Sequence, residues 1–388
     1  MVRDLAYGIG AIGIMNIVLQ FVVYPLVNRL VGSAGFGEML FWLGIISILA
    51  PSFGLAVNNT RLVFPKREET ENGDYFYLVC LFAIISMFIV GGIGIVQETS
   101  VLSIVILLYI VGVSVFRNYS TVEYRLRLNY SKQFLFYVIL SVGYIVGILG
   151  CRITKDWSWI FIVGETIAML YVIYTGCIYQ KKLKISKYFR QIGKQSFLLA
   201  GAYLITNLML NLDRIVLKYS VGDEAVSQYY VLSLLGKTVA LIGGPLSSVI
   251  ISYISKNHYQ LRRTEFMKII SGMLAGGALF LLGAVVATPI YIKLLYPNLY
   301  GSTIGLNIII NAAQVLYFLT TILLVIILTY CESKWQLIIQ IVYSVSFLIS
   351  AMILTNIYGL EGFAVAAIFA NGLYFVLTGI VGFWFVKK

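Results

Sequence analysis

Four basic side chains lie within or at the ends of long apolar stretches of this 388-residue sequence: Lys237, Arg214, Arg61 and Arg29. A charged side chain at the centre of a lipid-embedded helix costs about 2.5 to 3.5 kcal/mol, so it normally faces a cavity or a partner. Lys237 lies twelve residues into its stretch, too deep for its ammonium to reach the surface easily. Such cations could bind the oxygens of a pyrophosphate. The alternatives are an ion pair for Lys237 and lipid-headgroup contact for the arginines.

Two acidic side chains, Glu165 and Asp213, also lie in apolar stretches. A desolvated carboxylate can take up a proton near neutral pH, so either residue could be a proton or cation site that drives a transport cycle. Equally, the two acids could be counter-ions of Lys237 and Arg214. The sequence leaves both hypotheses open.

Amide side chains recur at helical spacing in three apolar stretches. Residues three or four positions apart share one face of a helix, so each set forms a polar stripe that must face protein or water. Amides offer donors and acceptors to sugar hydroxyl groups, and hydrogen bonds between helices are the alternative. The three sets are Asn16 and Gln20, Asn207 and Asn211, and Asn307, Asn311 and Gln314.

The composition identifies the elements that carry these residues. Hydrophobic residues make up 60% of the chain and charged residues only 11%, with a mean hydropathy of +0.92. Soluble domains are about one quarter charged, so a water-soluble globular protein is excluded. A spanning helix needs about 20 apolar residues. The sequence therefore predicts an all-α integral membrane protein.

Apolar runs separated by charged or Gly/Pro-containing breaks predict about twelve transmembrane helices. They are Leu5 to Leu30, Met39 to Phe64, Tyr75 to Val96, Val101 to Phe116, Phe134 to Ile153, Trp157 to Tyr179, Ser196 to Leu217, Ala225 to Ile254, Ile269 to Leu295, Thr303 to Tyr330, Trp335 to Ile357 and Gly362 to Val386. Prolines at positions 25, 51, 245 and 289 fall inside these runs, where each permits a bend.

The distribution of Lys and Arg gives the orientation. Twenty of the 28 lie on the side of both termini and five on the other side, which predicts that both termini are cytoplasmic. The +12 charge thus reports topology rather than nucleic-acid binding. A basic segment, 181–195, separates an N-terminal lobe, 1–180, from a C-terminal lobe, 196–388. This linker could form an amphipathic surface helix that attracts anionic membrane lipids.

The two halves are weakly similar to each other at an offset near 190 residues. Asn16 and Gln20 correspond to Asn207 and Asn211, and small polar residues follow the first helix of each half. Internal repeats of this kind are typical of duplicated transporter folds. We therefore expect two six-helix bundles around a central cavity.

Three segments carry a family resemblance: Tyr24 to Gly32 with Gly35-Phe36-Gly37, Asn211 to Arg214 with Tyr229-Tyr230, and Tyr358 to Ala366. They resemble the polysaccharide flippases, the O-antigen and exopolysaccharide exporters of the MATE/MOP superfamily, over nearly the whole chain. The resemblance implies a flippase that moves undecaprenyl-pyrophosphate-linked oligosaccharides from the inner to the outer leaflet of the bacterial cytoplasmic membrane by alternating access. It implies a role in surface polysaccharide biosynthesis, with a polysaccharide polymerase and chain-length machinery as further partners.

Under this hypothesis Lys237, Arg214, Arg61 and Arg29 would bind the pyrophosphate and the amide stripes the glycan. We expect a monomer, no cofactor, no metal and no catalytic residue. A multidrug exporter of the same superfamily and a membrane-embedded polysaccharide polymerase or ligase are the alternative functions. The first usually has an acidic cluster in its first lobe, whereas the first predicted helix has only Asp4 at its start. The second usually has a large external loop, and the predicted external loops are short.

Overall fold

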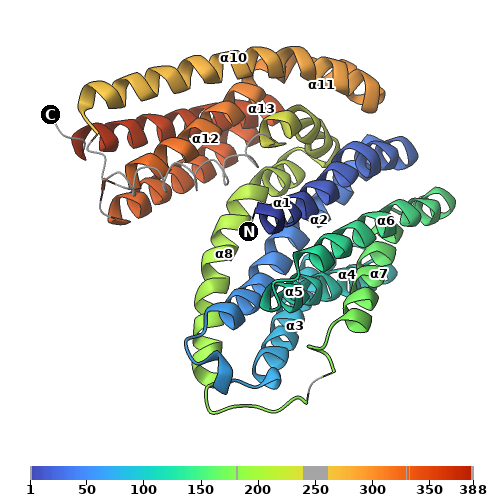
Figure 1. Cartoon of the computed structure of the whole chain (residues 1–388). Coiled ribbons are helices and arrows are strands. Elements are labelled where there is room, and N and C mark those ends of the chain that lie inside the picture. The colour runs from blue at the N-terminus through green and yellow to red at the C-terminus, as the bar shows by residue number, and fades with distance from the viewer. Residues whose placement is uncertain (1, 181, 239–260, 329, 332, 386–388) are drawn as a thin grey trace. The chain divides into compact units, whose positions relative to one another are not determined.

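The computed structural model describes residues 2–180, 182–238, 261–328, 330–331 and 333–385. It contains two compact units, Met1–Arg214 and Ile215–Lys388. The division falls within one helix, α8, whereas the sequence prediction placed the lobe boundary at the linker 181–195. The described residues form helices and connecting loops with no extended strand among them (Figure 1).

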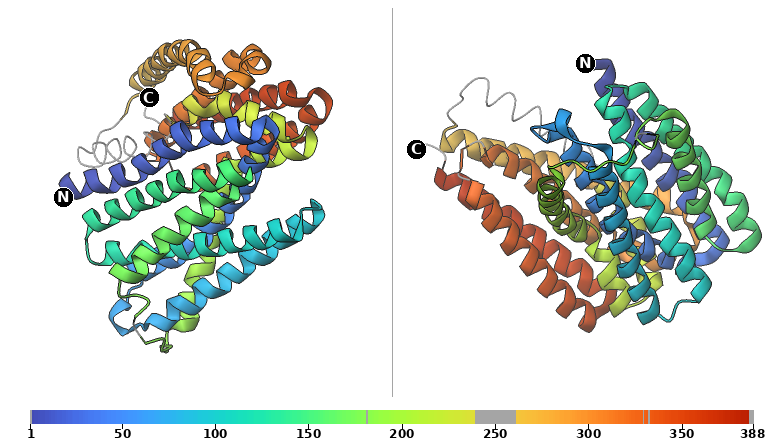
Figure 2. Two further views of the ribbon diagram at one scale, coloured as in Figure 1. Left: turned by 90° about the vertical axis from the view of Figure 1, so that its right-hand side faces the viewer. Right: turned by 90° about the horizontal axis from the view of Figure 1, so that it is seen from below.

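The first unit contains the helices predicted for the N-terminal half and also most of α8, which corresponds to the first span predicted for the C-terminal lobe. Helices α1, α6 and α7 lie side by side, and α4 packs against α2, α3 and α7 (Figures 1 and 2). The middle of α2 is the core of this unit, with Met39, Leu40 and Val57 fully buried. The elements are α1 (Val2–Ile17), η1 (Val18–Val23), α2 (Tyr24–Val63), η2 (Arg67–Glu69), α3 (Asn72–Val96), α4 (Val101–Ser120), α5 (Val122–Leu126), α6 (Tyr130–Thr154), α7 (Ser158–Thr175) and α8 (Phe189–Ser220).

The long helix α2 contains the predicted break between the first two spans. Gly32 has φ 79° and ψ 177°, which residues with a Cβ atom rarely adopt. Because these angles are not helical, the helix direction changes at Gly32. The preceding segment η1 is a π-helix that ends just before Pro25. Because proline lacks an N–H and its ring crowds the previous turn, a widened turn at this point relieves the conflict.

The second unit begins within α8, at Ile215. After α8 come a helix at residues 223–238 and then α10 (Arg263–Leu295), η3 (Pro297–Leu299), α11 (Tyr300–Thr303), η4 (Ile304–Leu306), α12 (Asn307–Leu328) and α13 (Ser333–Phe385). Gly359, with φ 59° and ψ −137°, divides α13 where the last two predicted spans are separated. Most of the predicted span Ala225 to Ile254, including Pro245, lies outside the described residues.

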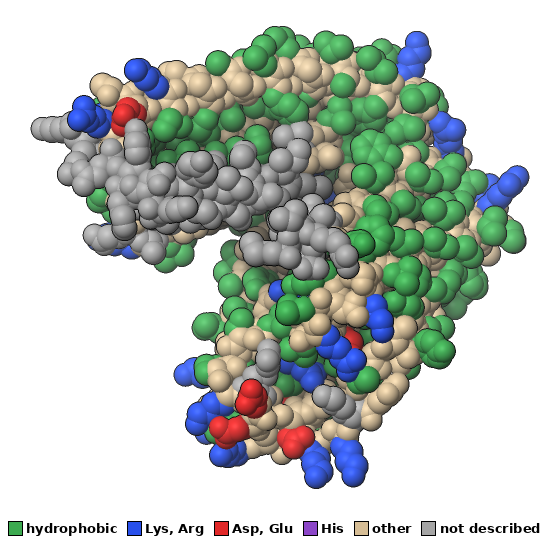
Figure 3. Space-filling view, viewed as in Figure 1, with side chains coloured by type: hydrophobic (Ala, Val, Ile, Leu, Met, Phe, Trp, Pro, Cys, Tyr) green, Lys and Arg blue, Asp and Glu red, His purple; other side chains and the backbone are tan. Residues whose placement is uncertain are grey.

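Nine helices among the described residues are long and apolar enough to cross a membrane. Dividing α2 and α13 at their glycine kinks gives eleven such segments. The helix at 223–238 corresponds to the start of the remaining predicted span, Ala225 to Ile254. Large apolar side chains such as Phe88, Val101 and Leu279 are exposed, as expected against lipid. Figure 3 shows hydrophobic side chains over most of the visible helix sides. The prediction of an all-helical, multi-pass membrane protein is confirmed.

Helices α6 and α7 approach each other closely through glycines. A Cβ on Gly147 would lie 2.5 Å from the Cα of Ile160, and one on Gly143 would lie 2.7 Å from the Cα of Gly164. Gly143 and Gly147 are four residues apart, the spacing that places small residues on one helix face and lets backbones pack in a membrane.

We expect Gly147→Val to separate α6 from α7, because the clash is with backbone that cannot rotate away. Overpacking of this kind costs about 1 to 3 kcal/mol or more. Thermal inactivation in detergent measures the loss. Gly92→Val is the matched control, since Gly92 is an exposed helical glycine with open space around it. Equal melting temperatures for the two variants would contradict the packing argument.

Candidate functional site

Arg61 lies buried at the end of α2. The helix ends because Phe64 is extended and precedes Pro65, which disfavours helical geometry before it. Arg61 is 8% exposed, and its guanidinium donates to Asn72 Oδ1 at 2.9 Å and to the hydroxyl of Tyr119, and lies 4.8 Å from the ring centroid of Tyr75. All of these groups are neutral, and Arg61 forms no ion pair with any described residue. Its charge therefore remains available to an anion.

A cavity of about 250 Å³ lies against Arg61. Glu71, at the start of α3, is the only acid among the described residues that line it. Three cationic side chains therefore line the cavity together with one carboxylate, an arrangement that suits a phosphate group. The lining residues are Arg61, Thr70, Glu71, Asn72, Lys182 and Lys184.

The basic linker forms one wall of this cavity. In the predicted linker, 181–195, residues 182–188 form irregular chain and a turn, and residues 189–195 form the start of α8, so a helix occupies only the second part of the linker. The N–H of Ser186 donates to Asp74 Oδ1 at 2.8 Å, and Gly73 packs so tightly that a Cβ there would lie 2.3 Å from the carbonyl oxygen of Lys184. The start of α3 thus holds Lys182 and Lys184 beside Arg61.

A second attachment joins the linker to η2. The Tyr188 hydroxyl donates to Glu69 Oε2 at 2.8 Å, and the Lys187 ammonium lies 3.3 Å from the same oxygen. The hydrogen bond from Tyr188, followed by that from Lys187, lowers the pKa of Glu69 below its ordinary value. An acid whose pKa falls on folding stabilises the folded state above its ordinary pKa, and the effect disappears as the pH drops through the lowered value. At neutral pH the Glu69 carboxylate therefore contributes its full stabilisation to this attachment.

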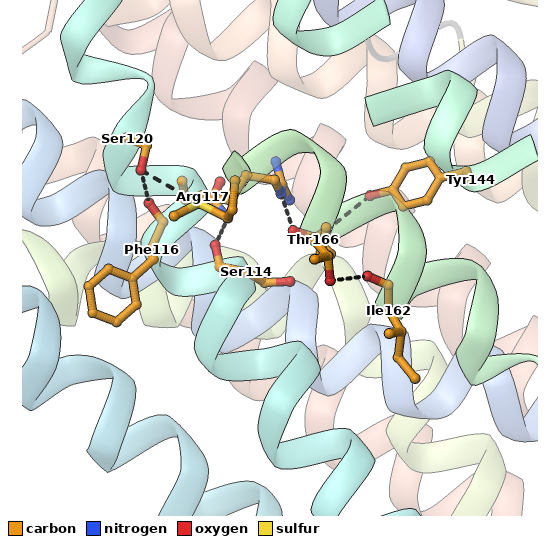
Figure 4. A network of polar contacts seen from close by, with 10 residues as sticks. Ser114, Phe116, Arg117, Ser120, Tyr144, Ile162 and Thr166 are labelled. Atoms are coloured by element: carbon orange, nitrogen blue, oxygen red, sulfur yellow. Dashed lines mark hydrogen bonds and ion pairs between the residues drawn. The ribbon is translucent and has the colours of Figure 1, made fainter. Parts of the chain in front are cut away.

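Glu165 on α7 is paired within the first unit. Its Oε2 lies 2.5 Å from Arg117 Nε, its Oε1 accepts from the Tyr144 hydroxyl at 3.0 Å, and it is 3% exposed. Figure 4 shows Arg117 from α4 and Tyr144 from α6 converging on the part of α7 that carries Thr166. The sequence predicts that the fourth span ends at Phe116, whereas α4 continues to Ser120 and therefore carries Arg117.

The polar face of α8 packs along α2 inside the first unit. Asn207 Nδ2 donates to Ser52 Oγ at 2.9 Å, and Arg214 Nη1 donates to the Leu40 carbonyl oxygen at 3.3 Å. Arg214 passes across Gly44, where a Cβ would meet its Cδ at 2.9 Å. These two predicted site residues therefore join α8 to α2. For Asn207, this contact is the hydrogen bond between helices that the sequence left open as the alternative to glycan binding.

Asn211 and Asp213 occupy the same part of α8. Asn211 Nδ2 donates to the Asn207 carbonyl oxygen one turn earlier, at 2.9 Å, and Asp213 is 7% exposed. Asp213 is buried and Arg214 is half-buried, and the first unit ends at Arg214. Their roles in ion coupling and pyrophosphate binding remain predictions.

The predicted site residues near the N-terminus are more accessible. Asn16 in α1 is half-buried and has no hydrogen-bond partner among the described residues. Gln20 lies in the π-helical η1, whose wider turn changes the register that i, i+4 spacing assumes. Arg29 is exposed near the kink at Gly32.

In the second unit, the structure brings Lys237 and Gln314 to the same tyrosine. The Lys237 ammonium lies 5.7 Å from the ring centroid of Tyr229, and Gln314 Nε2 donates to the Tyr229 hydroxyl at 3.3 Å. Gly236 allows this approach, since a Cβ there would lie 2.4 Å from the Cβ of Gln314. Lys237 and Gln314 are both half-buried.

The other two amides of α12 bond inside the second unit. Asn307 Nδ2 donates to the Val285 carbonyl oxygen at 2.8 Å, and Asn311 Nδ2 donates to Asn307 Oδ1 at 2.8 Å. Asn307 is 4% exposed and Asn311 is fully buried. In this structure they join α12 to α10, so of the predicted stripe only Gln314 is partly accessible.

The cavity at Arg61 includes two residues, Lys182 and Lys184, that the sequence places in the basic linker with roles in topology and lipid attraction. A run of lysines next to the end of a span could have indicated an anion site. Arg117 is not among the predicted site residues, and only the structure shows its pairing with Glu165. No group of His, Cys, Asp and Glu suited to holding a metal ion occurs in the described part of the chain.

Comparison with known proteins identifies the fold. No protein-family model matches the sequence, and no curated protein matches it. Among solved structures, the chain is similar to an inward-facing multidrug resistance MATE family transporter of the MOP superfamily, with TM-score 0.68 and 15% identity over 97% of this chain and 96% of that one. The lipid II flippase MurJ in an inward closed conformation gives TM-score 0.64 and 16% identity over 94% and 86%.

A third similar structure is a MOP superfamily transporter from Pyrococcus furiosus described as having a binding pocket of reverse polarity. Its TM-score is 0.55, at 13% identity over 97% of this chain and 94% of that one. At these identities the likeness establishes the fold: the chain has the architecture of MOP-superfamily transporters. Proteins with multidrug and lipid-linked substrates share this fold, so the substrate has to be argued from the residues.

Proposed function

We propose that the protein is a flippase that moves undecaprenyl-pyrophosphate-linked oligosaccharides from the inner to the outer leaflet of the bacterial cytoplasmic membrane, for surface polysaccharide biosynthesis. The observation that supports this most strongly is Arg61, a buried guanidinium with neutral partners that faces a cavity lined also by Lys182 and Lys184. An isolated buried charge is costly, and an anionic group entering the cavity would compensate it.

The cavity suits the first step of such a cycle. With both termini cytoplasmic, as the charge distribution predicts, the end of α2 and the linker face the cytoplasm, where the lipid-linked substrate is made. Figure 3 shows Lys, Arg, Asp and Glu side chains gathered at one end of the first unit. The segments next to the cavity, from the end of α2 to α3 and from the linker to α8, include the exposed charged residues Lys66, Glu68, Lys187 and Arg190. Positive charge at this end would attract the phosphate groups of the substrate.

A multidrug exporter is the second candidate, because the fold is shared with MATE transporters. Cationic drugs are attracted by unpaired acids, whereas Glu165 is already neutralised by Arg117. The cavity at Arg61 would repel a cation. The charge of the site therefore favours an anionic substrate over a cationic drug.

Reconstituted vesicles test this proposal. The full chain is incorporated into liposomes that contain a fluorescent undecaprenyl-pyrophosphate-linked disaccharide, and transfer between leaflets is followed by quenching with dithionite. We expect protein-dependent transfer, and a reduction of about five- to tenfold in Lys182→Gln/Lys184→Gln, because two of the three cations at the cavity are removed.

The matched control is Lys132→Gln/Lys268→Gln, which removes two exposed lysines that do not line this cavity and should leave transfer unchanged. Transport of ethidium without transfer of the lipid would instead establish the multidrug function. Conversion of the lipid-linked disaccharide to a longer glycan would establish an enzyme.

A further inference from the structure

A second cavity, of about 240 Å³, lies at the opposite end of the first unit from Arg61. Its walls come from α2, from the turn between α3 and α4, and from the turn between α6 and α7, three regions predicted to face the cell exterior. Drug-sized ligands occupy pockets of about 300 to 1,000 Å³, so this cavity fits a smaller ligand, about one sugar ring. Its lining includes Glu38, Trp42, Ser103, Lys155, Asp156 and Trp157.

Ser158 supplies an independent indication of a ligand. It also lines the cavity and is 4% exposed, yet its hydroxyl has no hydrogen-bond partner among the described residues. Buried polar groups in native proteins are normally hydrogen-bonded, and a hydroxyl can both donate and accept. Its backbone N–H is already used, since it donates to Asp156 Oδ1 at 2.9 Å and begins α7.

Aromatic surface and charge at this cavity indicate the type of ligand. Trp42 and Trp157 are 2% and 8% exposed, so they form rigid walls rather than mobile flaps. Tryptophan presents a large apolar ring against which the C–H groups of a sugar can pack, while carboxylates and hydroxyls accept and donate to its hydroxyl groups. The lining carries two carboxylates, Glu38 and Asp156, and one ammonium, Lys155, and Asp156 Oδ1 already accepts from the Ser158 N–H.

We infer that this cavity is a saccharide-binding site, which receives a terminal sugar of the glycan on the outer side. The identity of the ligand rests on the proposed function, because that function brings a glycan to this face. Glu38 and the Ser158 hydroxyl would hydrogen-bond the sugar hydroxyls in this cavity. The phosphate cavity at Arg61 and this saccharide cavity would then serve opposite ends of the same substrate's path.

Saturation-transfer difference NMR tests the inference on the full chain in nanodiscs. The probes are free glucose, galactose and N-acetylglucosamine. We expect saturable millimolar binding of at least one sugar, weakened at least fivefold by Glu38→Gln and by Ser158→Ala. Both variants preserve side-chain volume closely, and the second removes a hydroxyl that has no internal partner, so neither should impair folding.

Glu98→Gln and Ser131→Ala are the matched controls, since both residues are exposed and lie outside the cavity lining. Binding that all four variants leave unchanged, absence of binding by every sugar, or tighter binding of tetramethylammonium would overturn the inference. The lipid-transfer assay runs in parallel. Transfer without sugar binding overturns only the saccharide site, and sugar binding that depends on Glu38 and Ser158 without transfer overturns only the flippase.

Discussion

Arg117→Met is expected to destabilise the protein by about 3 to 5 kcal/mol, because it leaves the buried carboxylate of Glu165 without its counter-ion. The ion pair is 2.5 Å long, and the side chains of Arg117 and Glu165 are 13% and 3% exposed. Tyr144 would still donate to Glu165, but one neutral hydrogen bond compensates little of the charge. Methionine keeps the volume and flexibility of the arginine stem, so the loss would reflect charge rather than packing.

The double variant Arg117→Met/Glu165→Gln separates the two effects. Removing both charges eliminates the desolvation problem, so we expect it to recover most of the stability that the single variant loses. Thermal inactivation in detergent, read by size-exclusion chromatography, measures both proteins. A double variant as unstable as Arg117→Met would contradict the ion-pair explanation.

The same double variant tests whether Glu165 couples transport to an ion. If the folded double variant transfers the lipid substrate at the wild-type rate and responds to an ion gradient as the wild type does, Glu165 has a structural role. A folded protein that loses gradient dependence would support the coupling role predicted from the sequence. The contacts of Glu165 favour the structural role, because its carboxylate joins α7 to α4 through Arg117 and to α6 through Tyr144.

Lys237→Gln is expected to reduce transfer of the lipid-linked substrate by about 10- to 100-fold. A charge-assisted hydrogen bond contributes about 1.5 to 3 kcal/mol, and each 1.4 kcal/mol changes an equilibrium tenfold. Lys237 is half-buried and its ammonium lies over the Tyr229 ring, so the side chain is positioned by the second unit rather than free on its surface. Glutamine keeps a polar group at the site, which limits the effect on folding.

Lys237→Arg preserves the charge and should retain more than half of the activity. Lys268→Gln removes an exposed lysine of α10 in the same unit and should have no effect. Transfer rates in vesicles, normalised to the amount of reconstituted protein, provide the comparison. Equal rates for Lys237→Gln and wild type would remove Lys237 from the predicted pyrophosphate site.

The sequence by itself determined the architecture. The number and order of the membrane-spanning helices follow from the length of each apolar run, and the breaks within α2 and α13 follow from glycines at 32 and 359. These are local properties, because a backbone segment in lipid has to satisfy its own hydrogen bonds within a helix. The sequence also indicates Arg61 as one of four candidate cations, with lipid-headgroup contact as the alternative.

Only the tertiary structure decided the partners of the polar residues. Glu165 and Arg117 are 48 positions apart on different helices, and Asn311 contacts α10 at Thr288 across 23 positions. Hydropathy predicts that such side chains avoid lipid. Which neighbour each side chain contacts depends on the rotation and packing of its helix. The cavities at Arg61 and at Ser158 are likewise formed by turns distant in sequence, which meet because the helices between them span the same thickness of membrane.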